Sequence, residues 1–110
     1  MGVTLLEFHV LLALASGTLH GYAIAERVAA ESGGTLRPRA GSLYRVIARL
    51  ISEGLVAESE SEAGTPHPGL ARRYYTLTAT GRRTLGEEAG RLKQAAAVAA
   101  KRLGLARGRS

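Results

Sequence analysis

Residues 3–15 are apolar on nearly every side of a helix rather than along a single stripe. A helix without a polar face must be covered all round. A chain of 110 residues forms one domain with one modest core, which can cover only one face of such a helix. We therefore predict a helix over 3–15 whose remaining apolar face, with Leu5, Phe8 and Leu12, lies against a second chain.

A second helix is predicted over 20–32, where Ile24 and Val28 share one face. Gly33 and Gly34 follow it, and glycine is common just past the end of a helix.

A third helix is predicted over 40–53 from a continuous apolar stripe. The stripe consists of Leu43, Val46, Ile47, Leu50 and Ile51. A short strand is expected just before it, over 35–37, because Pro38 favours an extended conformation in the residue that precedes it.

The rest of the chain predicts a β-hairpin followed by a long helix. Residues 55–60 alternate loosely between apolar and polar, and 72–77 are rich in aromatic and β-favouring residues. The segment 61–71 contains glycine and proline and is expected to be a loop. Thr78 can cap a helix that runs to about residue 104. The predicted fold class is mainly α with a small β-hairpin.

The formal net charge of +6 is concentrated in the middle and at the end of the chain. Residues 1–36 carry −2, whereas 37–83 hold eight Arg and four Glu, and 84–110 hold six basic and two acidic residues. A localised basic surface favours a polyanionic partner, because Lys and Arg that bind phosphates release counterions. Charge alone leaves nucleic-acid binding and simple solubility equally open.

The polar side of the helix over 40–53 carries only small polar and arginine side chains, namely Ser42, Arg45, Arg49 and Ser52. No acidic residue lies between Gly33 and Ser52, although surface helices usually mix both signs. A helix fits the major groove of duplex DNA, where Arg can contact guanine and Ser can reach a base edge or a phosphate. An ordinary solvated face is the alternative.

Three neighbours of this face are further candidates for DNA contact. Arg37 and Arg39 precede the helix, where free backbone N–H groups favour a phosphate. Tyr44 lies beside the basic face and can either donate to a phosphate or cover the edge of the core.

The hairpin offers a second set of DNA contacts. Its loop carries His67, and Arg72 and Arg73 begin the returning strand. Such an arm can follow a minor groove or the phosphate backbone. Glutamates at 58, 60 and 62 on the outgoing strand oppose an anionic partner and favour the alternative, a loop with arginines beside it that does not bind DNA. We expect the two arginines to contribute more than the loop tip.

The last helix has a heptad seam, which favours dimerisation. Its positions recur at alternating intervals of four and three residues: Leu85, Ala89, Leu92, Ala96, Ala99 and Leu103. Packing on its own domain alone is the alternative, because the seam is short. A homodimer also suits operator DNA, in which two half-sites lie about 34–36 Å apart.

Other classes of protein fit these residues less well. His9, His20 and His67 lack metal-ligand spacing, and the sequence has no Gly-rich phosphate loop, so we expect no enzyme activity, no metal and no cofactor. The run over 3–15 is too short to cross a bilayer, and a chain without cysteine fits the cytoplasm. The alternatives are a sequence-neutral architectural or RNA-binding protein and a pure protein-interaction domain. Arg45 and Arg49 argue against the protein-interaction domain.

Three segments resemble the PadR-type transcriptional regulators: HGYAIAERV over 20–28, LRPRAGSLYRVIARLISEGLV over 36–56 and RRYYTLTATGRRTL over 72–85. The resemblance covers roughly residues 5–90. Its strongest matches are Gly21-Tyr22, Gly41-Ser42-Leu43-Tyr44, Leu50, Gly54-Leu55 and the run from Arg73 to Gly81.

The resemblance implies a winged helix-turn-helix domain over 1–79, a C-terminal dimerisation helix over 80–104 and a frayed basic tail over 105–110. It places Ser42, Tyr44 and Arg45 on the recognition helix, and Arg72 and Arg73 at the wing.

The resemblance also implies a homodimer that represses transcription until a small-molecule effector relieves it. The single C-terminal helix is similar to the compact branch of the family. Some compact relatives stack flat aromatic ligands on a tryptophan, and this chain has none. Its effector cavity would be lined by Phe8, Leu12, Leu92 and Ala96.

Overall fold

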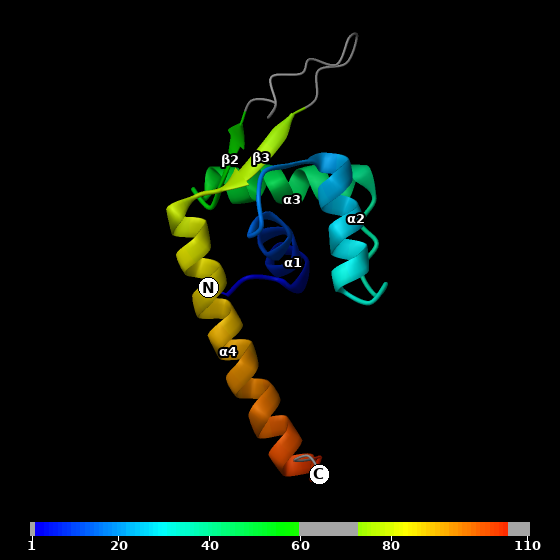
Figure 1. Ribbon diagram of the computed structural model, residues 1–110, viewed down its shortest axis with the longest axis vertical. Coiled ribbons are helices and arrows are strands. Elements are labelled where there is room, and N and C mark those ends of the chain that lie inside the picture. The colour runs from blue at the N-terminus through cyan, green and yellow to red at the C-terminus, as the bar shows by residue number, and fades with distance from the viewer. Residues whose placement is uncertain (1, 60–72, 106–110) are drawn as a thin grey trace.

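The computed structural model describes residues 2–59 and 73–105, and Figure 1 shows how they are arranged. The elements follow in the order α1 (Leu5–Leu14), β1 (Leu19–His20), α2 (Gly21–Glu31), α3 (Ala40–Ser52), β2 (Val56–Ser59), β3 (Tyr74–Leu77) and α4 (Ala79–Leu103). The predicted fold class, mainly α with a small β-hairpin, is confirmed. Every predicted helix is present, with ends that differ by at most two residues from those expected.

Helix α1 begins at a capping box formed by Thr4 and Glu7. The Thr4 hydroxyl accepts the backbone N–H of Glu7 at 3.1 Å, and Oε1 of Glu7 accepts the N–H of Thr4 at 2.9 Å. These bonds satisfy donors that the start of a helix otherwise leaves free. The box fixes where α1 begins and holds the Glu7 side chain against the start of the helix.

The core forms around α1, which contacts α2, α3 and α4 (Figure 1). Its buried residues come from all four helices and from β2 and β3. The largest fully buried side chains are Leu11, Leu14, Ile24, Leu43, Ile47, Leu50, Val10 and Val28. Removal of this apolar surface from water is the main contribution that stabilises the fold.

The strands form one antiparallel sheet in the order β1-β3-β2. Val56 pairs with Leu77 across the hairpin, and Leu19 pairs with Tyr75 on the other edge of β3. The two-residue strand β1 therefore ties the start of α2 to the hairpin.

The strand predicted over 35–37 is wrong, and β1 is the third strand instead. The hydroxyl of Ser32 accepts the backbone N–H of Leu36 at 2.9 Å, so this segment is bonded locally rather than in a sheet. His20, expected within the second helix, has an extended backbone and caps α2, because its Nδ1 accepts the N–H of Ala23 at 3.3 Å.

Helix α4 packs on the rest of the domain only near its beginning. Gly81 and Leu85 are its buried residues, whereas residues 89–99 are all exposed. In Figure 1 the orange and red part of the helix extends away from the other elements. Neither α4 nor any other helix in the described part of the chain is long and apolar enough to cross a membrane.

Candidate nucleic-acid interface

The exposed face of α3 lies opposite its buried stripe. The residues on this face are Gly41, Arg45, Ala48 and Ser52, and all four are exposed. Arg45 forms no hydrogen bond or ion pair with any of residues 2–59 and 73–105. A Cβ added at Gly41 would meet nothing within 4 Å. In the described part of the chain, the guanidinium of Arg45 therefore projects without a partner from a helix surface of small side chains, a shape that suits a major groove.

The beginning of α3 differs from the beginnings of the other helices. Thr4, His20 and Thr78 cap α1, α2 and α4 through their side chains, whereas α3 follows Arg39 without a side-chain cap from the described residues. The N–H groups in the first turn of α3 are therefore open to an anion. Arg39 is exposed beside them, and Ser42 is half-buried at the same end.

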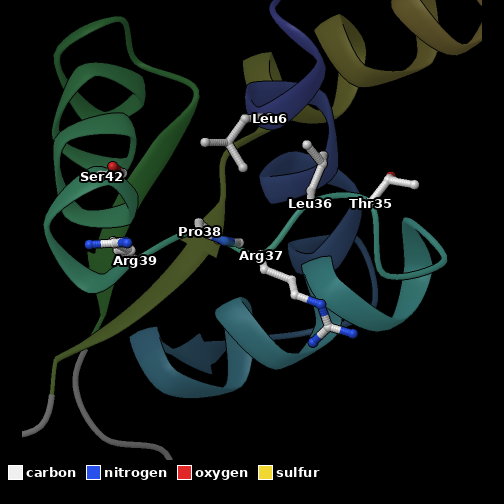
Figure 2. Close-up of a pocket in the computed structure, with 7 residues that line it drawn as sticks. All are labelled: Leu6, Thr35, Leu36, Arg37, Pro38, Arg39 and Ser42. Carbon is white, nitrogen blue, oxygen red and sulfur yellow. The ribbon is translucent and has the colours of Figure 1, made fainter.

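A hollow of about 320 Å³ lies beside this end of α3. Figure 2 shows its lining, which consists of Leu6, Thr35, Leu36, Arg37, Pro38, Arg39 and Ser42. Arg39 lies against the beginning of α3, whereas Arg37 points toward α2. The Arg37 side chain packs over Gly34, where an added Cβ would lie 3.2 Å from its Nη2. The two arginines thus line the same hollow, but their side chains point in different directions.

Tyr44 packs across the beginning of α2. Its hydroxyl lies over Gly21, and a Cβ added at Gly21 would lie 2.9 Å from the Cζ of Tyr44. Tyr44 is nevertheless 48% exposed, so it covers the edge of the core and remains accessible at the side of α3.

The phenol of Tyr75 on β3 is held uncharged. Burial raises its pKa above the ordinary value, the neighbouring Tyr44 and Glu58 raise the pKa further, and Arg73 lowers it. The junction between the hairpin and α3 therefore keeps a neutral phenol in its interior.

Arg49 is the predicted DNA contact whose surroundings differ most from those of Arg45. Its Nε lies 3.4 Å from Oε2 of Glu7 on α1 and 3.3 Å from Oε2 of Glu53 just past α3. The ion pair with Glu7 was not predicted from the sequence. The pattern Thr4-x-x-Glu7 before an apolar run does signal a capping box, but nothing local indicates which residue its carboxylate meets.

The wing is formed by β2 and β3. The Nη1 of Arg73 donates to Oε2 of Glu58 at 2.8 Å across the hairpin, and both side chains are largely exposed. Glu58, one of the glutamates expected to oppose an anionic partner, thus forms an ion pair with Arg73. His67 and Arg72 lie outside the described residues.

The residues predicted for a dimer interface fall into two groups. Leu85 is 9% exposed and belongs to the core of its own chain. The remaining seam residues are all exposed: Ala89, Leu92, Ala96, Ala99 and Leu103. On α1, Leu5 is exposed and Phe8 and Leu12 are half-buried. On α4, the exposed apolar residues of the seam therefore begin at Ala89.

Within residues 2–59 and 73–105, no three His, Asp or Glu side chains lie close enough to hold a metal ion.

Helices α2 and α3 form a helix-turn-helix, the hairpin of β2 and β3 lies beside it as a wing, and α3 carries the exposed Arg45. This arrangement defines the class of winged-helix DNA-binding proteins. The chain matches the sequence profile of the transcriptional regulator PadR-like family over residues 10–87, and it belongs to this family. The family consists of transcriptional regulators and not of enzymes.

Solved structures with a similar fold agree with this assignment. A PadR family transcription regulator from hypervirulent Clostridium difficile R20291 has a TM-score of 0.75 at 22% identity, over 92% of this chain and 100% of that chain. PadR of Bacillus subtilis, solved in complex with operator DNA, has a TM-score of 0.63 at 27% identity, over 76% of this chain and 46% of that chain.

An uncharacterized 37.1 kDa protein in transposon TN4556 of Streptomyces fradiae is 45% identical over 80 residues. These residues are 73% of this chain and 21% of that protein. The chain thus spans about a fifth of the length of this relative.

Proposed function

We propose that this chain is a homodimeric regulator that binds operator DNA in a sequence-specific manner and represses transcription in the cytoplasm. The observation that carries the proposal is the free Arg45 guanidinium on an exposed helix face without acidic residues. A bidentate contact between Arg and guanine is the commonest specific contact in the major groove.

The other contacts are assigned to the sugar–phosphate backbone. Arg39 and Ser42 lie at the uncapped start of α3, where a phosphate can accept from the backbone N–H groups. Tyr44 can donate its hydroxyl at the side of the helix. The wing supplies Arg73, together with Arg72 and His67 of the predicted loop. Arg37 folds over Gly34 and is assigned a minor part.

The dimer is assigned to the apolar residues that the chain leaves uncovered. Leu92 is 41% exposed, Leu103 is 70% exposed, and Leu5 on α1 is 57% exposed. In a monomer these apolar side chains remain in contact with water, whereas a two-fold interface would bury them on both chains. Two α3 helices held by one interface can read two half-sites.

Relief of repression by a small molecule rests on the family resemblance. Phe8 and Leu12 on α1, with Leu92 and Ala96 on α4, would line a cavity between the two chains. These side chains are aliphatic apart from Phe8, so the cavity suits an apolar effector better than one that needs stacking on both faces.

Replacement of Arg45 tests the proposal. Arg45→Ala should weaken operator binding by about 1–3 kcal/mol and relax the preference for one base pair. The measurement is a titration on the operator and on a scrambled duplex of equal length at one salt concentration. Arg45→Lys is the matched control, because it keeps the charge and loses the planar fork. We expect it to retain binding to the scrambled duplex and to lose specificity.

Two outcomes of this titration speak against the assignment. Equal losses of Arg45→Ala on both duplexes would make Arg45 a phosphate contact. A wild-type protein with equal affinity for both duplexes would instead favour the sequence-neutral alternative.

A further inference from the structure

The carboxylate of Glu7 is buried and held on one side by the backbone. The residue is 7% exposed, and its Oε1 accepts the N–H of Thr4 at 2.9 Å. The hydroxyl of Thr4 in turn accepts the N–H of Glu7, so each of the two side chains is bonded to the backbone of the other residue. The Glu7 carboxylate therefore cannot move into solvent without breaking its bond to the N–H of Thr4 at the start of α1.

The other oxygen of this carboxylate faces Arg49. Its Oε2 lies 3.4 Å from the Nε of Arg49 in an ion pair, whereas the hydrogen bond of this Nε goes to Oε2 of Glu53 at 3.3 Å. The guanidinium thus lies between a carboxylate of α1 and a carboxylate just past the end of α3. A buried carboxylate needs a cation or several hydrogen-bond donors near it. If Arg49 turned toward a phosphate, the carboxylate of Glu7 would keep, among the described residues, only the N–H of Thr4.

We infer that Arg49 is a positioning residue, which fixes α3 on the first turn of α1 and does not contact DNA. This inference rests on the proposed operator binding by α3. Arg45, one helical turn earlier, has no such partner among the described residues, and it supplies the base contact. The ion pair between Arg49 and Glu7 sets how α3 lies on α1, the helix that also carries the exposed Leu5.

Two variants separate the ion pair from the cap. Arg49→Ala removes the cation. Glu7→Gln removes the negative charge, but its amide oxygen can still accept the N–H of Thr4, because Gln serves in a capping box as Glu does. The experiment measures the affinity of each variant for the operator and for a scrambled duplex at several salt concentrations.

We expect both variants to weaken operator binding by a similar factor of about 3 to 30. Binding to the scrambled duplex and the salt slope on the operator should stay as in the wild type. The double variant should lose no more than either single variant. A general loss of folded protein would lower both affinities together, so the ratio between the two duplexes distinguishes positioning from simple destabilisation.

A phosphate contact by Arg49 predicts different results. Arg49→Ala would then lower the salt slope by about 0.9 for each subunit of the dimer, and Glu7→Gln would strengthen binding by releasing the cation. Either result, or wild-type affinity in Arg49→Ala, overturns the inference. If the wild type does not distinguish operator from scrambled DNA, it is the proposed function that fails. The ion pair between Arg49 and Glu7 is then tested by a double-mutant cycle of the free energies of unfolding. Additive effects of the two substitutions would overturn the inference.

Discussion

Gly81→Ala is expected to destabilise the protein by about 3 kcal/mol, at the upper end of the usual cost of overpacking. Gly81 is buried in the first turn of α4, where a Cβ would overlap the carbonyl oxygen of Leu55. The same Cβ would lie 2.9 Å from the carbonyl carbon of Leu55 and 2.9 Å from Cδ1 of Leu77. Two of these atoms belong to the backbone, so a change of rotamer cannot relieve the overlap, and α4 must move off the hairpin.

Thermal unfolding at a fixed protein concentration measures this effect, and we expect the Tm to fall by about 10–20 °C. Gly86→Ala is the matched control, because it lies in the same helix and its Cβ would meet nothing within 4 Å. Alanine in an open helical position stabilises by about 1 kcal/mol relative to glycine, so the Tm of Gly86→Ala should rise. Equal Tm values for the two variants would show that α4 does not pack on Leu55 as described.

Leu92→Glu is expected to dissociate the homodimer and to weaken operator binding at least about 100-fold, the usual gain from joining two binding units. Leu92 is 41% exposed in the single chain, and in a two-fold interface it would be covered by the second chain. A carboxylate at this position loses its hydration without gaining a counter-charge, and symmetry places a second carboxylate near it.

Sedimentation velocity at micromolar concentration reports the change in mass. Gln94→Glu introduces the same single charge two residues further along α4, where the residue is exposed and lies off the seam. We expect this control to sediment as a dimer and to bind the operator as the wild type does. If Leu92→Glu also remains a dimer, the interface does not include the middle of α4.

Local patterns in the sequence predicted most of the fold. The apolar stripe of α3, the glycines after α2 and the cap at Thr78 each depend on residues within a few positions of one another. Pairing between distant segments was not predictable in this way. Strand β1 has only two residues, too few to show alternation, and it exists because the free edge of β3 at Tyr74 and Tyr75 is available to pair with it.

The candidate site was predicted in the same uneven manner. The exposure of Arg45 follows from its place opposite Leu43 and Leu50 on one helix. The partners of Arg49 and Arg73 depend on how α1 packs on α3 and on the register of the hairpin. Leu85 has the same heptad spacing as Leu92, yet it lies where α4 still touches the core. Spacing shows which residues share a face, but it does not show where along the helix the domain ends.

The central claim is that two exposed α3 helices, held by one interface, read a specific DNA sequence. Selection of bound duplexes from a random-sequence pool, followed by sequencing, tests this claim most directly. We predict enrichment of an inverted repeat whose half-sites lie about one helical turn apart, bound about 10³-fold or more tightly than the starting pool. Recovery of duplexes with no common sequence, bound no more tightly than the pool, would contradict the claim.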